Sequence, residues 1–336
     1  MKILTEEELK AAETALTAFL PHSMQVYGYI SIVNRVKSVS LDVFVDAWPD
    51  FTTILCQPQR KEEGDFFKDL CVFSKDETTL VKIFSENALL NCGEFVCIAA
   101  DLCHGETLLG VARNMGIPGK RIAVCHLMKL QDPSCLPLVD SLPLRVSTLD
   151  ESHVDLVNRT WKFGCGERSS GMIRDMIRHY PSCCLMDGEG RAVAWVLTYA
   201  SCAMGMLYTL PEYRGKGYAK ALIRAMATRL HAQGYPVYCF IEEENQLSYE
   251  LFKNWASLRT PPTGQPVVLA VCRSDWPVLL CLGRGTLQAH PGAWSHNYNP
   301  PFTPTPHRNS GHDGFSCTNK TLATASPTLT IDPRVV

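Results

Sequence analysis

The sequence predicts an α/β (α+β) fold with two domains. Short apolar segments with the alternation of β-strands lie between segments whose apolar residues recur every three or four positions, as on one face of a helix. A chain of 336 residues with 46% hydrophobic content is long enough to bury two cores. Residues 209–233 are the most informative segment, because a basic glycine-rich turn joins a strand to an amphipathic helix there.

The composition excludes several classes of protein. The net charge of −2 argues against a nucleic-acid-binding surface, and no run of 18 apolar residues offers a membrane span. We therefore expect a soluble globular protein that acts on small molecules.

The fifteen cysteines and ten histidines indicate neither a disulfide framework nor a metal site. The chain has no Cys-x-x-Cys pair, no apolar signal segment and no ligand spacing of histidines, so we expect no metal and mostly reduced, buried thiols. Cys183 and Cys184 are adjacent on an expected strand, which would direct them to opposite faces.

Residues 1–20 are expected to form a helix. Thr5 and Glu8 form a capping box at its start, and Pro21 follows its end. Residues 26–33 alternate well enough to predict a strand.

Residues 48–51, Trp-Pro-Asp-Phe, precede another apolar segment. Pro49 fixes a turn that orients both aromatic side chains, which we assign to the core, with a substrate-side role as the alternative. The pattern weakens between residues 62 and 140. Residues 132–143 contain three prolines and form the best candidate for a linker.

The second domain is expected to begin near residue 144. Thr148 and Glu151 predict a capping box for a helix through Asn158, and a second amphipathic helix reaches Tyr180. An antiparallel meander follows, with strands expected at residues 182–186, 191–199 and 204–210.

The turn after the third strand has the properties of an anion site. Arg214, Gly215, Lys216 and Gly217 lie just before the helix, where the first backbone N–H groups have no intrahelical partner. Glycines allow close approach of an anion, and the two basic side chains add charge. The segment therefore predicts a pyrophosphate cradle, although an ordinary strand-turn-helix connection is the alternative.

The spacing of Arg214, Gly217 and Ala219 fits Arg-x-x-Gly-x-Gly/Ala and resembles the acetyl-CoA signature of the GNAT superfamily of acyl-CoA N-acyltransferases. The sequence TLPEYR at residues 209–214 resembles, more specifically, the glycine N-acyltransferase family. Further family-like stretches occur in the same order at residues 26–28, 46–51, 158–161 and 164–167.

The resemblance implies two tandem GNAT-like domains, with acyl-CoA as the co-substrate and no permanently bound cofactor. Residues 1–140 correspond to the family's N-terminal domain and residues 144–258 to its acyl-CoA-binding catalytic domain. The expected CoA-binding residues are Leu210, Arg214, Gly215, Lys216, Gly217, Tyr218, Ala219 and Asn245.

The C-terminal part departs from the family. Residues 260–336 hold 11 of the 21 prolines and few charges, which predicts an atypical, partly disordered tail. Residues 267–272 and 278–282 are strand-like, and they are candidates to replace the last strands of the family's fold.

Acyl transfer to an amine requires a base, a donor to the oxyanion and a proton for the leaving thiolate. By resemblance, the backbone of the strand ending at Leu210 supplies the donor. The position expected to carry the catalytic glutamate is Ala203, so Glu212 and Glu167 are the substitutes; Glu212 is alternatively a solvated turn residue.

The expected general acid also differs from the superfamily. Phe252 stands where a tyrosine is common, and Tyr249 or Ser248 are the alternatives. Arg168 and Arg174 are candidates for binding the acceptor carboxylate, with exposed helix charges as the alternative.

Three functions follow from these observations. The first is acyl transfer from acyl-CoA to glycine or a related small amino acid by a monomer; the second is acyl-CoA binding without catalysis; the third is protein N-acetylation. The acidic first helix argues against a cleavable presequence, so a mitochondrial location follows only from the resemblance, with a cytoplasmic one as the alternative.

Overall fold

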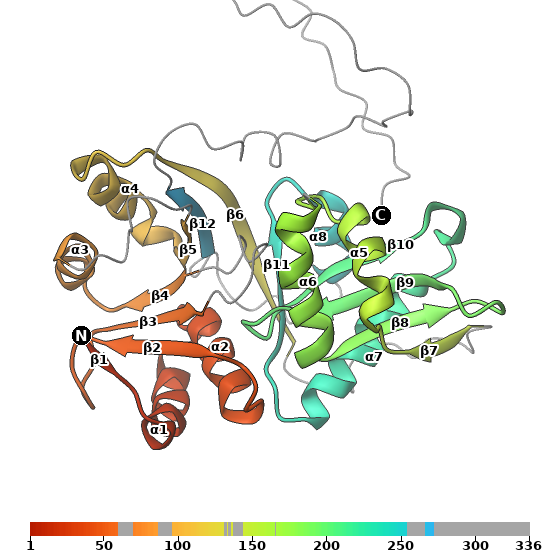
Figure 1. Cartoon of the computed structure of the whole chain (residues 1–336), viewed down its shortest axis with the longest axis horizontal. Helices are drawn as coiled ribbons and strands as arrows, with labels where there is room; N and C mark the ends of the chain where they lie inside the picture. Colours follow the sequence, from red (N-terminus) through yellow and green to blue (C-terminus); the bar gives the residue numbers. More distant parts are fainter. Residues whose placement is uncertain are drawn as a thin grey trace, which may run out of the picture. The chain divides into compact units, whose positions relative to one another are not determined.

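The computed structural model describes residues 1–59, 70–86, 96–130, 133, 136, 144–164 and 166–253, without the side chain of Arg168, and the backbone of residues 266–271. All of these residues belong to one compact unit. Their elements form two successive halves (Figure 1). Among the described helices, none combines the length and apolar character needed to cross a bilayer.

The helix predicted for residues 1–20 is shorter than expected, because Lys2–Ile3 form a strand and the α-helix covers Glu6–Leu16, but its predicted start is correct. Thr5 Oγ1 accepts a hydrogen bond from the Glu8 N–H, and Glu8 Oε2 accepts one from the Thr5 N–H, which confirms the capping box. The elements of the first half are β1 (Lys2–Ile3), α1 (Glu6–Leu16), η1 (Thr17–Phe19), α2 (Met24–Arg35), β2 (Leu41–Val45), β3 (Thr53–Pro58), β4 (Leu70–Ser74), α3 (Glu77–Glu86), β5 (Val96–Asp101), η2 (Leu102–His104), α4 (Gly105–Asn114) and β6 (Gly119–Leu130).

The strand predicted for residues 26–33 is wrong, because this segment lies within helix α2. Val26 and Ile30 pack into the core of the first half, whereas Met24 and Ile32 pack into a cluster with residues of the second half. A helix buried on two sides lacks a single apolar stripe, and its sequence therefore resembles a strand.

The second half follows the expected order, in which two helices precede an antiparallel meander, a helix and a further strand. The N-cap prediction at Thr148 is wrong, because Asp150 accepts the Ser152 N–H at the start of the first helical turn. Its elements are β7 (Arg145–Ser147), η4 (Glu151–His153), α5 (Val154–Thr160), α6 (Glu167–His179), β8 (Ser182–Met186), β9 (Ala192–Thr198), β10 (Met204–Thr209), η5 (Pro211–Tyr213), α7 (Tyr218–Ala232), β11 (Val237–Glu242), α8 (Gln246–Lys253) and β12 (Pro266–Val271).

The strand order shows that the second half repeats the first. The strand order in the sheet is β1-β2-β3-β4-β5-β12-β6-β11-β10-β9-β8-β7. From one end the strands β1 to β5 follow in chain order, and from the other end β7 to β11 do the same. Each half has one parallel pair, β4 with β5 and β10 with β11, and each has a helix between those two strands. The predicted fold class of two tandem α/β halves is confirmed.

The two halves exchange their last strands. β12 lies between β5 and β6 and is antiparallel to both, whereas the place beside β11 is taken by the second part of β6, from Cys125 to Leu130. The strand expected at residues 267–272 therefore forms, but it completes the sheet of the first half. Residues 278–282 and the rest of the predicted tail lie outside the described residues.

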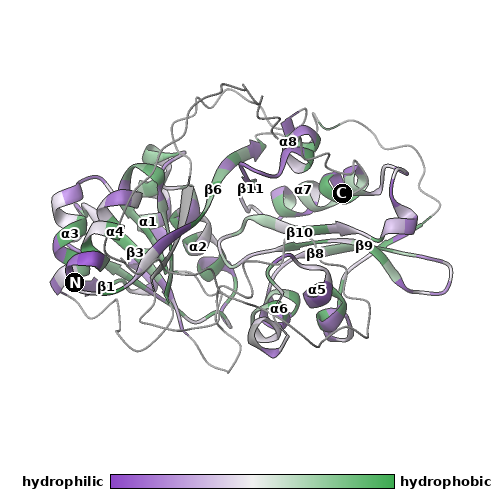
Figure 2. Cartoon of the chain, turned by 90° about the horizontal axis from the view of Figure 1, so that it is seen from above, coloured by the Kyte–Doolittle hydropathy of each residue, from purple (hydrophilic) through white to green (hydrophobic). Residues whose placement is uncertain are grey.

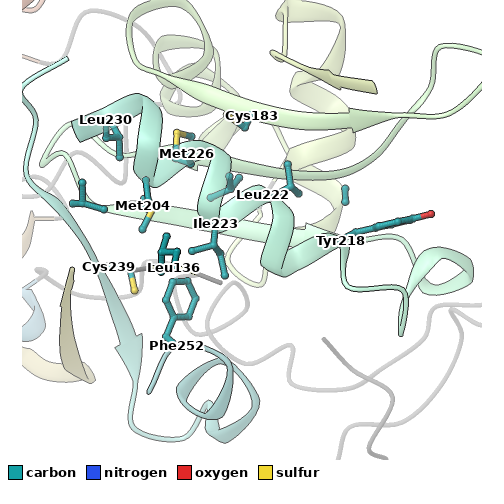
Figure 3. Close-up of a cluster of buried hydrophobic side chains, with 14 of the residues drawn as sticks. Leu136, Cys183, Met204, Tyr218, Leu222, Ile223, Met226, Leu230, Cys239 and Phe252 are labelled. Atoms are coloured by element: carbon teal, nitrogen blue, oxygen red, sulfur yellow. The ribbon is translucent and has the colours of Figure 1, made fainter. Parts of the chain in front are cut away.

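Helices cover both faces of the second half's sheet: α7 lies on one face, and α5 and α6 lie on the other (Figure 2). Leu222, Ile223, Met226 and Leu230 of α7 are buried together with Phe252 of α8, as Figure 3 shows. The apolar face predicted for α7 is therefore confirmed at these positions, whereas Ala219 is only half-buried.

Three further predictions concern the core. Phe51 is 2% exposed in the core of the first half, as assigned. Most of the predicted linker lies outside the described residues, but Leu136 is buried in the core beneath α7. Cys183 and Cys184 are buried on opposite faces of β8, as predicted, and burial raises the pKa of both thiols, to about 12 for Cys184.

Candidate active site

The start of α7 has the geometry of an open anion site. Gly215 and Gly217 are exposed, with φ angles of +74° and +79°, a region that favours glycine. A Cβ added at either position would meet no atom within 4 Å. Gly217 is the N-cap and has no side chain to bond the first helical N–H groups, so these donors have no side-chain partner at the cap.

The residues around this turn hold its basic side chains in place. Arg214 Nε donates to the Thr209 carbonyl over 3.0 Å, and its guanidinium lies 5.5 Å from the centroid of the Tyr208 ring. Lys216 Nζ lies 5.0 Å from the centroid of the Tyr213 ring. The Tyr218 side chain is 6% exposed and packs into the core, so this residue offers its backbone to the anion site.

In the first half, the corresponding turn before α3 carries an aspartate that caps the helix. Asp76 precedes α3 and accepts hydrogen bonds from both the N–H and the hydroxyl of Thr79, each over 2.7 Å. Those hydrogen bonds lower the pKa of Asp76, so the group is ionised near neutral pH. A side chain therefore caps the start of α3, whereas the start of α7 has no side-chain cap.

The backbone of β10 is only partly paired with the neighbouring strands. The register pairs β10 with β11 only through Met204 and Cys239, and beyond that point β11 continues along β6. A bulge lies between Gly205 and Tyr208, with Met206 at φ +50°. The strand edge that leads toward the anion site can therefore receive an extended ligand through backbone hydrogen bonds.

A cavity of about 290 Å³ lies on the sheet face opposite α7. Its walls come from α2, residues 38–41, the end of β3 and β6 of the first half, and from the segment between α5 and α6, α6, the β9–β10 turn and β11 of the second. The volume is close to the lower end, about 300 Å³, of small-molecule sites. Several of the described lining residues carry aromatic side chains; they are Tyr29, Trp161, Phe163, Tyr180, Tyr199 and Phe240.

The polar groups of this cavity were not predicted. Asp175 and His179 lie one turn apart on α6, and Glu242 is the last residue of β11. His179 Nδ1 is 3.0 Å from Ser38 Oγ. The helical spacing of Asp175 and His179 was a usable signal, but nothing in the sequence indicated that Glu242 faces a cavity.

The expected base position is enclosed. Ala203 is 2% exposed and packs with Met24, Ile32 and Tyr238. A carboxylate at this position would need space and hydrogen-bond partners among apolar groups. Glu212 is exposed on η5, and it is absent from the described walls of the cavity.

The remaining predicted residues lie at α8 and at the end of β10. Asn245 Oδ1 accepts the Ser248 N–H and so caps α8. Tyr249 is half-buried, with its ring centroid 4.9 Å from that of His126. The Leu210 N–H donates to the Val193 carbonyl, so this amide is already paired within the sheet.

The two arginines proposed for the acceptor carboxylate and the substitute base Glu167 lie on α6. Arg174 is half-buried and Glu167 is exposed, whereas the side chain of Arg168 lies outside the described part. Neither Arg174 nor Glu167 is among the described residues that line the cavity.

Comparisons with known proteins agree with this geometry. The family model of aralkyl acyl-CoA:amino acid N-acyltransferases matches residues 1–181, and that of the C-terminal region of the same family matches residues 183–265. A bovine glycine N-acyltransferase is 30% identical over 273 residues, covering 72% of this chain and 90% of the relative. A mouse glycine N-acyltransferase-like protein is 28% identical over 270 residues, covering 74% of this chain and 91% of the relative.

Two further relatives extend the comparison. A bovine glycine N-phenylacetyltransferase is 28% identical over 279 residues, covering 75% of this chain and 93% of the relative. Among solved structures, a Drosophila protein superimposes with a TM-score of 0.67 at 17% identity, covering 81% of this chain and 99% of that one. The last similarity supports the fold alone.

Proposed function

The chain belongs to the aralkyl acyl-CoA:amino acid N-acyltransferase family, and we propose that it transfers an acyl group from acyl-CoA to the amino group of glycine or a related small amino acid. The open N-terminus of α7 supports this proposal most directly, because it follows β10, whose edge facing β11 is unpaired beyond Met204, and because a cavity borders the same sheet. The resemblance stated for TLPEYR at residues 209–214 points in the same direction.

The proposed binding mode follows from these three parts. The pyrophosphate of CoA accepts hydrogen bonds from the first N–H groups of α7, with Lys216 nearby. The pantetheine arm pairs with the free edge of β10, and a backbone N–H beyond the bulge donates to the oxyanion. The acceptor amine then attacks the thioester carbonyl from the cavity, and CoA leaves as the thiol.

The second candidate is acyl-CoA binding without catalysis. Ala203 favours it, because this residue occupies the position where a catalytic glutamate was expected. The two functions differ in one measurable property, namely whether thiol release from acyl-CoA depends on glycine.

The experiment uses the purified full chain with an aromatic acyl-CoA and glycine. We expect release of CoA thiol that rises with glycine concentration, and an N-acylglycine product of the corresponding mass. Binding of acyl-CoA by calorimetry without glycine-dependent release would support the second candidate, whereas release with a peptide amine alone would indicate protein acylation.

A mitochondrial location and a monomeric state are also proposed. Imaging of the full chain fused to a fluorescent protein tests the first, and a cytoplasmic distribution would contradict it. Sedimentation of the purified chain tests the second.

A further inference from the structure

We propose that the ion pair between Lys162 and Glu242 receives the acceptor, with the ammonium group of an α-amino acid on Glu242 and its carboxylate on Lys162. Glu242 then accepts the proton that frees the amine. This inference rests on the proposed acyl transfer, and it assigns two residues to the choice of acceptor.

The position of Glu242 places a carboxylate beside the reacting centre. Phe240 and Glu242 line the cavity, whereas Cys239 and Ile241 alternate with them along β11 and pack beneath α7. Glu242 lies three residues beyond the Cys239–Met204 pair, in the part of β11 that no longer pairs with β10. An acyl-CoA arm paired with the free edge of β10 would bring its thioester to this level.

Lys162 supplies a cation beside this wall, although it is not itself among the described residues that line the cavity. Its Nζ lies 2.5 Å from Glu242 Oε2 and 5.1 Å from the centroid of the Phe163 ring. The neighbouring residues Trp161 and Phe163 both line the cavity. The side chains of Lys162 and Glu242 are 51% and 24% exposed, so the ion pair is accessible to a small solute.

The charges of this pair match those of an α-amino acid. Such an acceptor carries an ammonium group and a carboxylate on one carbon, and each end can form a charge-assisted hydrogen bond with one member of the pair. An amine without a carboxylate lacks the contact with Lys162. The pair therefore selects amino acids over simple amines.

The proposed step conserves atoms and charge. The acceptor arrives as an ammonium ion and transfers one proton to the carboxylate of Glu242, which leaves a lone pair on the nitrogen. A bond forms from that nitrogen to the carbonyl carbon, the carbon–sulfur bond breaks, and the second proton leaves the nitrogen for the thiolate. The proton on Glu242 returns to solvent.

The first half contains a related pair that serves as an internal comparison. Asp101 is the last residue of β5, and its Oδ2 is 2.6 Å from Nδ1 of His22, which precedes α2. The hollow beside this pair measures only about 10 Å³, roughly the space of one water molecule. A purely structural role for such pairs is therefore the competing explanation.

Four single variants and one charge swap test the proposal in the full chain. Lys162→Met and Glu242→Gln remove one member each, and Lys82→Met and Glu244→Gln are matched controls at exposed positions on α3 and after β11. The swap combines Lys162→Glu with Glu242→Lys, which restores the ion pair in reverse. Each protein is assayed with glycine and with glycinamide, which lacks the carboxylate, and its CoA affinity and unfolding midpoint are measured.

We expect Lys162→Met to raise the KM for glycine about 10- to 100-fold while the KM for glycinamide stays within twofold. Glu242→Gln should lower kcat about 100-fold or more with unchanged CoA affinity. The controls should match the wild type. The swap should recover the unfolding midpoint but not the transfer rate.

Several outcomes would overturn the inference while leaving the proposed function intact. Each of them requires that the wild type is active with glycine. The outcomes are a Lys162→Met variant with an unchanged KM for glycine, a Glu242→Gln variant with an unchanged kcat, or a charge-swap variant that recovers the transfer rate. A wild type that releases no thiol with any amino acid would instead refute the proposed function, and this inference with it.

Discussion

Replacing Gly217 by tryptophan should abolish most CoA binding without unfolding the protein. A side chain at this position meets no protein atom within 4 Å of its Cβ, so it extends into the space in front of the first N–H groups of α7. The pyrophosphate needs that space. Loss of one charge-assisted hydrogen bond, worth about 1.5–3 kcal/mol, corresponds to an affinity loss of about 10- to 150-fold.

The control variant must reproduce the backbone strain. Gly190 lies in the turn between β8 and β9, has the same φ of +79°, and is equally open. Both Gly217→Trp and Gly190→Trp should lower the free energy of unfolding by roughly 1–2 kcal/mol, because a side chain disfavours positive φ. Calorimetry with CoA should distinguish them, and a folded Gly217→Trp variant with wild-type affinity would refute the site.

Three further predictions concern stability. Gly28→Ala should lower the free energy of unfolding by at least about 1–3 kcal/mol, because its Cβ would lie 1.8 Å from the backbone oxygen of Ser201. In the control Gly110→Ala the new Cβ has no atom within 4 Å, so the free energy of unfolding should rise by roughly 0.5–1 kcal/mol. Equal denaturant midpoints of the two variants would contradict the contact between Gly28 and Ser201. Val268→Pro should destabilise the chain by about 1–3 kcal/mol through loss of a hydrogen bond in β12, and an unchanged melting temperature would argue against the strand exchange. Burial alone raises the pKa of Glu13, but hydrogen bonds from Asn34, Ser31 and Arg35 outweigh it and hold the pKa below the ordinary value, so this carboxylate stabilises the fold above about pH 4.5 and less as the pH falls through the lowered pKa. Between about pH 6 and about pH 3 the wild type should therefore lose more stability than Glu13→Gln, and parallel curves of unfolding free energy against pH would contradict this.

The sequence predicts the second half well because its elements have one buried face each. The strands β8, β9 and β10 lie within one residue of their expected bounds, and the apolar face of α7 is the expected one. The glycine turn before α7 was also predictable, since positive φ angles at Gly215 and Gly217 are the reason that glycines occur there.

Other features depend on contacts between distant parts of the chain. Helix α2 was missed because Gly28 brings it against the Ser201 turn of the second half, which buries a second face. The partners of β12 and of the second part of β6 follow from tertiary packing, which local periodicity does not encode. The cavity combines walls from both halves, so its polar residues could not be grouped from their spacing.

The repetition of the two halves makes their differences informative about function. The same succession of elements carries Asp76 before one helix and Gly217 before its counterpart, so one N-terminus is filled and the other is open. The hollow beside the carboxylate at the end of β5 is about 10 Å³, whereas that beside the carboxylate at the end of β11 is about 290 Å³. The larger cavity is shared between the halves: α2 and β6 of the first half line it together with residues of the second, and β6 also pairs with β11. An isolated second half would therefore lose a wall of its cavity and a neighbour of β11, so the first half completes the cavity although Asp76 caps the start of its own helix α3.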